Sequence, residues 1–157
     1  MKPKAIIVDL DGTLVLNDKR AIKFMDKHGK KAGSDHWDKF FVDSCRYDVP
    51  NQWCLDIVNA FAAQGMQILF VTGRGGSVAT EGVTREWLSM YISPAVRWEL
   101  HMRSADDKRP NHVIKKELMN TLMFKYNISF AIDDMKNNID MFRSLGIPAL
   151  HCADYID

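Results

Sequence analysis

Short runs of apolar residues alternate along the chain with segments whose apolar residues recur at helical spacing. The runs Lys4–Val8, Gln67–Val71 and Ile128–Ile132 are rich in apolar and β-branched residues, and their length suits strands buried on both faces. Val96–Met102 alternates apolar and polar residues, which indicates a strand with one wetter face. Pro148–Cys152 is predicted to be a last, short strand.

Four helices are predicted between these strands: behind Pro50-Asn51 and up to Gly65, around Val83 to Tyr91, from Pro110 to Leu122, and from Lys136 to Leu145. Gly65 and Gly146 stand where helix C-termini favour glycine, and Pro110 suits the first turn of a helix. Strands that alternate with helices predict an α/β fold of the Rossmann-like kind, with a mainly parallel sheet and helices on both faces. In such a sheet, functional groups gather at the carboxyl ends of the strands.

Residues 17–49 interrupt this alternation. They are rich in charge, with Phe24, Trp37, Phe40 and Tyr47 scattered among the charged residues. We expect a small helical cap, inserted after the first strand and holding its own aromatic contacts, within a single domain of residues 1–157. A long irregular loop is the alternative.

Composition excludes several classes of protein. The 157 residues carry 21 Lys and Arg against 20 Asp and Glu, so the net charge of +1 does not indicate nucleic acid or an anionic membrane as a partner. No segment approaches the roughly 20 apolar residues of a membrane helix, and the first apolar run is too short for a signal peptide. The three cysteines have no CxxC spacing, which favours reduced thiols and a cytoplasmic protein.

The run that follows the first predicted strand is Asp9-Leu10-Asp11-Gly12-Thr13. Side chains two residues apart in an extended segment point the same way, so Asp9 and Asp11 are expected to present two carboxylates together, with Leu10 turned toward the core. Carboxylates held this close need either a shared proton or a cation, and both arrangements serve catalysis. A solvated Asp-Gly turn is the alternative.

Asp133 and Asp134 end another predicted strand and are expected at the same edge of the sheet. Four carboxylates at one edge call for a divalent ion, and an all-oxygen ligand set suits Mg²⁺ better than Zn²⁺. The alternative is that Asp134 caps the helix that begins near Lys136.

Thr72-Gly73-Arg74 is expected to form a loop at the end of the second strand, where a hydroxyl, backbone N–H groups and a guanidinium could cradle a phosphate. The segment 103–116 is basic and could supply a lysine to the same edge, although a solvated surface is the usual meaning of such a run. No GxxxxGK[ST] sequence occurs, so a kinase-type nucleotide site is not expected.

Together, the motif Asp9-x-Asp11-x-Thr13, Thr72 after a strand, a lysine that opens a helix, and Asp133-Asp134 resemble the haloacid dehalogenase (HAD) superfamily of aspartate-dependent phosphotransferases. The resemblance covers essentially the whole chain. It implies a HAD-like fold, a Mg²⁺-dependent phosphatase and an aspartyl-phosphate intermediate. Asp9 would be the nucleophile, Asp11 the acid and base, and Asp9, Asp11, Asp133 and Asp134 the metal-binding positions.

The sequence is more narrowly similar to the phosphatase domain of bacteriophage polynucleotide kinase-phosphatase, through its opening Lys-Pro-Lys-Ala-Ile-Ile-Val-Asp-Leu-Asp-Gly-Thr-Leu, its Thr-Gly-Arg motif and Ala131-Ile132-Asp133-Asp134. This similarity implies that Lys115, not Lys116, takes the family lysine position. It also implies substrate contacts from Arg20, Arg74 and Arg103, beside Thr13, Thr72 and Gly73. Asn111 departs from the pattern, because the family has an aspartate four residues before the lysine.

The resemblance implies removal of a 3′-phosphate from a nucleic-acid end. Two alternatives are a nucleotidase that acts on free mononucleotides and a catalytically silent module that binds nucleic acid. The intact set of Asp9, Asp11, Lys115 and Asp133 disfavours the silent module.

Overall fold

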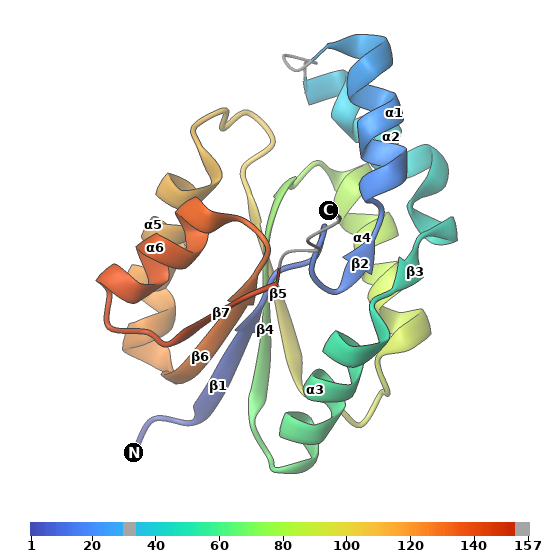
Figure 1. Cartoon of the computed structure of the whole chain (residues 1–157). Coiled ribbons are helices and arrows are strands. Elements are labelled where there is room, and N and C mark those ends of the chain that lie inside the picture. Colours follow the sequence, from blue (N-terminus) through green and yellow to red (C-terminus); the bar gives the residue numbers. More distant parts are fainter. Residues whose placement is uncertain (30–33, 153–157) are drawn as a thin grey trace.

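The computed structural model describes residues 1–29 and 34–152 of the chain. Within these residues, a five-stranded parallel sheet forms the centre, and helices cover both of its faces (Figure 1). Across the sheet the strands are β5 (Trp98–Arg103), β4 (Gln67–Gly75), β1 (Lys4–Val8), β6 (Asn127–Asp133) and β7 (Ala149–His151). This architecture confirms the predicted α/β fold with a mainly parallel sheet.

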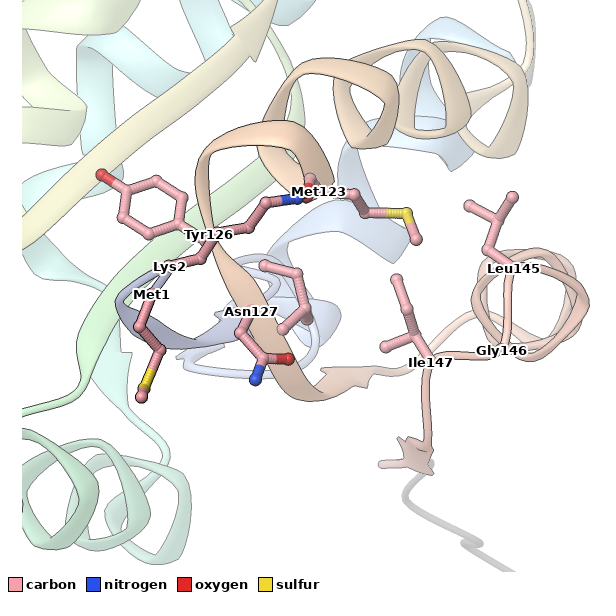
Figure 2. A pocket seen from close by; sticks show the side chains of 9 residues that line it. Met1, Lys2, Met123, Tyr126, Asn127, Leu145, Gly146 and Ile147 are labelled. Atoms are coloured by element: carbon pink, nitrogen blue, oxygen red, sulfur yellow. Dashed lines mark hydrogen bonds between the residues drawn. The ribbon is translucent and has the colours of Figure 1, made fainter.

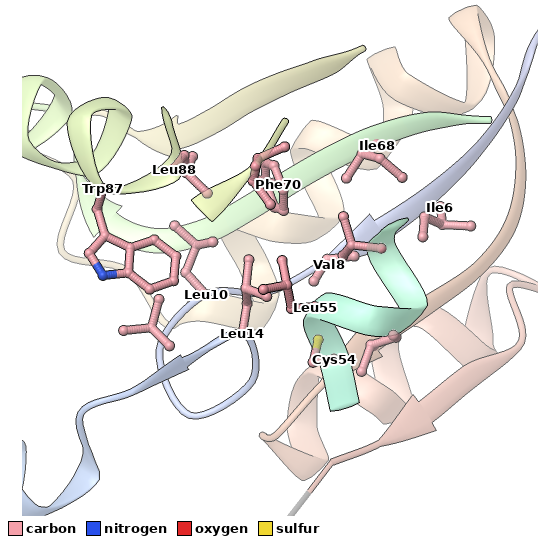
Figure 3. Packing of buried hydrophobic residues seen from close by; sticks show 14 of the residues in the cluster. Ile6, Val8, Leu10, Leu14, Cys54, Leu55, Ile68, Phe70, Trp87 and Leu88 are labelled. Carbon is pink, nitrogen blue, oxygen red and sulfur yellow. The ribbon is translucent and has the colours of Figure 1, made fainter. Parts of the chain in front are cut away.

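Helices α3 (Gln52–Ala63) and α4 (Val78–Tyr91) pack on one face of the sheet, and α5 (Asn111–Lys125) and α6 (Lys136–Ser144) pack on the other. The side chains of successive β1 residues point to opposite faces of the sheet. Ile6 and Val8 face α3 and α4, in the cluster that Figure 3 shows, whereas Ala5 and Ile7 face α5 and α6. Because both sides of β1 are buried, its sequence is a continuous apolar run instead of an alternating one.

The strand order reverses at β1. The chain runs from β1 outward to β4 and β5, then crosses back to β6 and β7 on the other side of β1. In a sheet of this kind the crevice for ligands lies where the order reverses, at the carboxyl ends of the strands. Here those ends are the ends of β1 and β6, which lead into Asp9 and Asp133.

The predicted boundaries differ from the structure in several places. β4 continues past Val71 to Gly75, because its pairing with β5 resumes at Gly75 after a register shift that follows Thr72. The Thr72-Gly73-Arg74 motif therefore lies in an irregular strand end, not in the predicted loop. Pro110 is the N-cap of α5 and not part of its first turn, and the last strand covers only Ala149–His151.

Most of segment 17–49 is helical, in α1 (Asp18–His28), α2 (Ser34–Ser44) and the 3₁₀ helix η1 (Cys45–Tyr47); residues 30–33 lie outside the described residues. The segment is flanked by β2 (Val15–Leu16) and β3 (Val49–Pro50), which pair antiparallel. The ring of Phe24 in α1 lies 4.7 Å from Trp37 and 4.9 Å from Phe40 in α2, centroid to centroid. Figure 1 shows α1 and α2 beyond the carboxyl ends of the strands, where a cap is expected.

Across the ranges 1–29 and 34–152, none of the helices combines the length and the apolar character that crossing a bilayer requires.

A cavity of about 410 Å³ opens at the amino ends of β1 and β6 (Figure 2). Met1 and Lys2 line it together with Met123, Tyr126 and Ile147. It lies at the end of the sheet opposite the acidic residues, and none of the predicted site residues lines it. This cavity therefore plays no part in the candidate active site.

Candidate active site

Asp9 lies directly after β1, where it is 6% exposed. The chain then turns sharply at Gly12, whose φ of 76° is a conformation that glycine adopts without strain. The turn is closed by the N–H of Gly12, which donates to the carbonyl of Val15 at 2.9 Å. Leu10 is fully buried in the core, as predicted, so β1 and the turn together fix where Asp9 lies.

Lys115 reaches Asp9 from α5. Its Nζ donates to Oδ1 of Asp9 and to Oδ2 of Asp133, each at 2.6 Å. Only 1% of Lys115 is exposed, so this ammonium group has left bulk water and relies on the two carboxylates. Lys115 lies in the first turns of α5, beside the buried Ile114, and this places it at the carboxyl edge of the sheet.

Three carboxylates meet at this point. Asp9, Asp133 and Asp134 each offer an oxygen, and these oxygens lie within 4.8 Å of one another. Burial raises the pKa of Asp9 well above its usual value; Lys115 opposes this shift, and the charges of Asp133 and Asp134 add to it. Lys115 pairs with Asp9 and Asp133, and Asp134 lies beside them. One ammonium charge does not balance three ionised carboxylates, so the negative charges repel one another.

A magnesium ion fits this set of donors. The candidate ligands are all carboxylate oxygens, the type that Mg²⁺ prefers. A divalent cation here would also offset the excess negative charge and favour the ionised form of Asp9.

Asp133 is held in place by the start of α6. Its Oδ1 accepts from the N–H of Met135 at 2.9 Å, and Nδ2 of Asn138 donates to both of its oxygens, at 2.9 and 3.1 Å.

Asp11 belongs to a second, adjoining network. Arg74 binds it with two parallel bonds, from Nη2 to Oδ1 at 2.7 Å and from Nε to Oδ2 at 3.0 Å. Asn17 Nδ2 also donates to Oδ1 at 2.6 Å. Burial acts to raise the pKa of Asp11, but the charge and hydrogen bonds of Arg74, with help from Asn17, outweigh it and lower the pKa.

Two expectations from the sequence need correction here. The carboxylates of Asp9 and Asp11 do not point to one shared ion, because Arg74 holds the Asp11 side chain away from the group formed by Asp9, Asp133 and Asp134. Asp134 does not cap α6, whose N-cap is Met135 and has no side-chain cap bond. Asp134 instead belongs to the carboxylate group with Asp9 and Asp133.

Thr13 and the residues of the predicted phosphate cradle, Thr72-Gly73-Arg74, make contacts within the protein. Thr13 Oγ1 donates to Oδ2 of Asp9 at 3.2 Å, and the Oγ1 of Thr72 accepts from the backbone N–H of Arg74 at 3.2 Å. A Cβ atom on Gly73 would lie 2.6 Å from Oδ1 of Asn111, so a larger residue there would require the Asn111 side chain to move. Asn111 therefore contacts the cradle, although it is not the aspartate of the family pattern.

Arg20 and Arg103 lie apart from the carboxylate group. Arg20 binds the Asp48 carboxylate through Nε at 2.9 Å and Nη2 at 2.5 Å, and it stacks 3.7 Å from the centroid of the Phe40 ring. Arg103 Nη1 donates to the carbonyls of Asp107 and Arg109, at 3.2 and 3.1 Å. The structure thus places Arg20 at the cap segment and Arg103 under the loop that precedes α5.

Sequence reasoning missed four residues that organise the two networks: Asn17, Cys45, Thr84 and Asn138. Each acts by holding an aspartate or Arg74. Asn138 had a usable signal, since it lies one helical turn beyond the acids, where a first-turn side chain can face back to the strand end. Thr84 lies in the run 83–87, which the sequence shares with the phosphatase domain of bacteriophage polynucleotide kinase-phosphatase. Cys45 had no signal, because only the packing of η1 on α4 brings it to Arg74.

Comparison with known proteins identifies relatives of the whole chain. The family described as the polynucleotide kinase PNKP phosphatase domain matches residues 3–155. A protein of Autographa californica nuclear polyhedrosis virus, named for bifunctional polynucleotide kinase/RNA ligase activity, is 30% identical over 158 residues, which cover 99% of this chain and 20% of that protein.

Solved structures give the same result. A chain of the Pnkp1/Rnl/Hen1 RNA repair complex is 28% identical with a TM-score of 0.74, over 98% of this chain and 44% of that one. A HAD family enzyme from Bacteroides thetaiotaomicron, solved as a magnesium complex, is 15% identical with a TM-score of 0.59, over 100% of this chain and 96% of that one, and shares the fold. The chain thus spans about a fifth of the curated relative and less than half of the repair-complex chain.

Proposed function

The chain belongs to the PNKP phosphatase-domain family and is a phosphatase of the HAD type, and from this premise we propose that it removes the terminal phosphate from 3′ ends of nucleic acid. The observation that carries the proposal is the group of Asp9, Asp133 and the half-buried Asp134 at the carboxyl edge of the sheet, with Lys115 paired to Asp9 and Asp133. This site combines a candidate nucleophile with cationic groups that can accept a phosphate.

Asp9 is the proposed nucleophile. One of its carboxylate oxygens attacks phosphorus, a P–O bond forms to Asp9, and the P–O bond to the ribose oxygen breaks. Water then attacks phosphorus in a second step, which releases inorganic phosphate and restores the carboxylate. Thr13 Oγ1, which donates to Oδ2 of Asp9, orients this carboxylate for the attack.

Asp11 is the proposed acid and base. It gives a proton to the departing ribose oxygen in the first step and takes one from the attacking water in the second. Arg74 favours the ionised form of Asp11, which suits the second step. For the first step, a phosphate dianion that arrives beside Asp11 raises the pKa of this carboxyl, because like charges repel.

Asp9, Asp133 and Asp134 are the proposed side-chain ligands of Mg²⁺, with the backbone carbonyl of Asp11 as a further oxygen. When bound, the ion would supply positive charge that offsets the repulsion between the carboxylates and the phosphate. Lys115 and the hydroxyl of Thr72 are proposed to hold the non-bridging oxygens, where negative charge gathers in the transition state.

The nucleic-acid substrate is supported by the relatives, whose names refer to polynucleotide kinase and RNA repair. We propose that Arg20 and Arg103 meet phosphates of the strand, since phosphate contacts set the register of a bound nucleic acid. The bidentate pair of Arg74 with Asp11 favours a role for this arginine in holding Asp11.

Residues 17–49 are the proposed cap of a single domain of residues 1–157. Cys45, Cys54 and Cys152 form no disulfide within the described residues, and we propose that the protein acts in a reducing cytoplasm.

Replacement of the nucleophile gives the first test. We expect Asp9→Asn to retain less than about a thousandth of wild-type turnover, because an amide cannot form the phosphorylated intermediate. Steady-state rates with Mg²⁺ measure this loss. Asp56→Asn, which changes an exposed acid on α3, is the matched control and should leave turnover unchanged. Turnover of Asp9→Asn above that level would remove Asp9 as the nucleophile.

Substrate choice gives the second test. Rates are compared on one oligonucleotide that carries a 3′-phosphate or a 5′-phosphate, and on 3′- and 5′-mononucleotides, each with Mg²⁺ and with a chelator. The proposal predicts the highest kcat/KM on the 3′-phosphorylated oligonucleotide, a value that falls with added salt, and no activity in the chelator. Equal or higher rates on mononucleotides, with little salt dependence, would instead identify a nucleotidase.

A further inference from the structure

Arg74 is anchored on three sides. Its Nε and Nη2 bind Asp11, whereas Nη1 donates to the Sγ of Cys45 at 3.2 Å and to the Oγ1 of Thr84 at 3.0 Å. The guanidinium carbon also lies 4.4 Å from the centroid of the Phe41 ring. Only 3% of Arg74 is exposed, so these protein contacts replace nearly all of its hydration.

The anchors of Nη1 come from different parts of the fold. Thr84 belongs to α4, and its hydroxyl donates to the carbonyl of Thr80 at 2.7 Å, which leaves the oxygen lone pairs for Arg74. Cys45 belongs to η1 in the cap segment and is fully buried. Its S–H faces the carbonyl of Val83 at 4.0 Å, and the sulfur accepts from Arg74. Burial raises the pKa of the Cys45 thiol although Arg74 acts against it, so the proton needed for the contact with Val83 stays on sulfur.

We propose that Cys45 is a positioning residue for Asp11: its sulfur, carried by the cap segment, fixes Nη1 of Arg74 and thereby the plane in which Nε and Nη2 hold the Asp11 carboxylate. A guanidinium is rigid and planar, so a constraint on one nitrogen sets the direction of the other two. The cap segment, through Cys45, then determines how Asp11 faces the substrate. This inference rests on the proposed acid role of Asp11.

The predicted consequence depends on the leaving group. A ribose oxygen must be protonated as it departs, whereas p-nitrophenolate is stable enough to leave without a proton. A change that only misplaces Asp11 therefore slows the first step on a 3′-phosphorylated oligonucleotide far more than the first step on p-nitrophenyl phosphate. The second step, in which Asp11 acts as the base, is common to the two substrates and is left out of the comparison. A change that only damages the fold slows both substrates to the same extent.

The experiment compares the rate of the first step on these two substrates, measured in a single turnover as release of the dephosphorylated oligonucleotide or of p-nitrophenolate, for wild type, Cys45→Ala, Cys45→Ser and Thr84→Val. We expect Cys45→Ala to lower this rate on the oligonucleotide about tenfold, the effect of roughly 1.4 kcal/mol, and to change it on p-nitrophenyl phosphate far less. Cys45→Ser should restore part of the loss, because its hydroxyl can accept from Nη1. Thr84→Val removes the other acceptor with little change of shape and should give the same selective loss. Cys54→Ala, at a buried cysteine in α3, is the matched control and should show no selectivity.

The variant Asp11→Asn distinguishes a failure of the proposed acid role of Asp11 from a failure of the proposed positioning role of Cys45. If this variant slows the first step equally on both substrates, the proposed acid role of Asp11 fails, and the inference fails with it. If Asp11→Asn is selective but Cys45→Ala and Thr84→Val lose both activities equally or lose neither, the proposed function survives and the positioning role of Cys45 is overturned.

Discussion

Lys115 and Lys116 are neighbours on α5, but only Lys115 is buried. A buried ammonium group is costly unless opposite charges compensate it, and Asp9 and Asp133 provide that compensation. The same two ion pairs also stabilise the carboxylates of Asp9 and Asp133, which are buried away from water. This single side chain therefore sets the electrostatic balance of the site.

Lys115→Met tests this balance through the pH dependence of stability. Without the ammonium group, the pKa of Asp9, already raised by burial, rises further. A carboxyl whose folded-state pKa lies above its unfolded value stabilises the fold below the unfolded pKa, and this contribution disappears as the pH rises through the folded pKa. In urea unfolding with a chelator, we expect a loss of about 3–5 kcal/mol at pH 8 and a smaller loss at pH 5.

Lys116→Met is the control for that prediction. It removes one positive charge from the exposed side of the same helix, and its free energy of unfolding should stay within about 0.5 kcal/mol of wild type at both pH values. A Lys115→Met variant as stable at pH 8 as at pH 5 would mean that the carboxylates do not depend on this lysine.

At the scale of elements, the turn between β1 and β2 and the helix α4 use glycine in opposite ways. Gly12 has a φ of 76°, which the turn from Asp9 to Asp11 requires. Gly82 lies exposed within α4, where a Cβ atom would meet nothing within 4 Å. Glycine is needed in the turn, whereas in the helix it only adds conformational entropy to the unfolded chain.

Alanine substitution should therefore have opposite effects at these two positions. We expect Gly82→Ala to raise the free energy of unfolding by about 0.5–1 kcal/mol with unchanged activity. Gly12→Ala should lower it by about 1–2 kcal/mol, because an L-residue resists this φ, and should reduce kcat by moving Asp11. Thermal unfolding and steady-state rates measure both effects, and a stabilising Gly12→Ala would show that the turn tolerates another conformation.

At the scale of the whole molecule, the parallel sheet brings together two strands that lie far apart in the sequence. β1 and β6 are hydrogen-bonded neighbours, so Asp9 and Asp133 emerge side by side although most of the chain separates them. The fold thus brings together a group of carboxylates, the proposed metal ligands, that the unfolded chain does not have. Ligand binding to such a site must stabilise the folded state.

Mg²⁺ should accordingly raise the melting temperature of the protein. At a concentration of about 100 times Kd, the expected stabilisation is about 2.7 kcal/mol, and a chelator should reverse it. Asp134→Asn should weaken or abolish this shift, because Asp134 is one of the three candidate ligands. Asp140→Asn, at an exposed acid of α6, is the control and should keep the full shift. A shift that persists in Asp134→Asn would place the ion elsewhere.

The sequence by itself determined the elements and the order of the motifs. The apolar runs predicted the five strands of the central sheet and four of its helices, because burial on both faces leaves a pattern that each segment shows locally. The same logic placed Asp9, Asp11, Asp133 and Asp134 at strand ends, hence at one edge of the sheet. Lys115 could be told from Lys116 only by resemblance to a family, since both open the same helix.

Only the tertiary structure decided which acids share a site. Residue spacing predicted that the Asp9 and Asp11 side chains act together, but Arg74 draws Asp11 into a separate network, and Lys115 joins Asp9 to Asp133. Cys45 reaches Arg74 because η1 packs against α4, and Thr84 reaches it because α4 packs on β4; no local pattern records these contacts. The physical reason is that burial is a property of each segment, whereas charge pairing depends on distances between segments that only the folded chain sets.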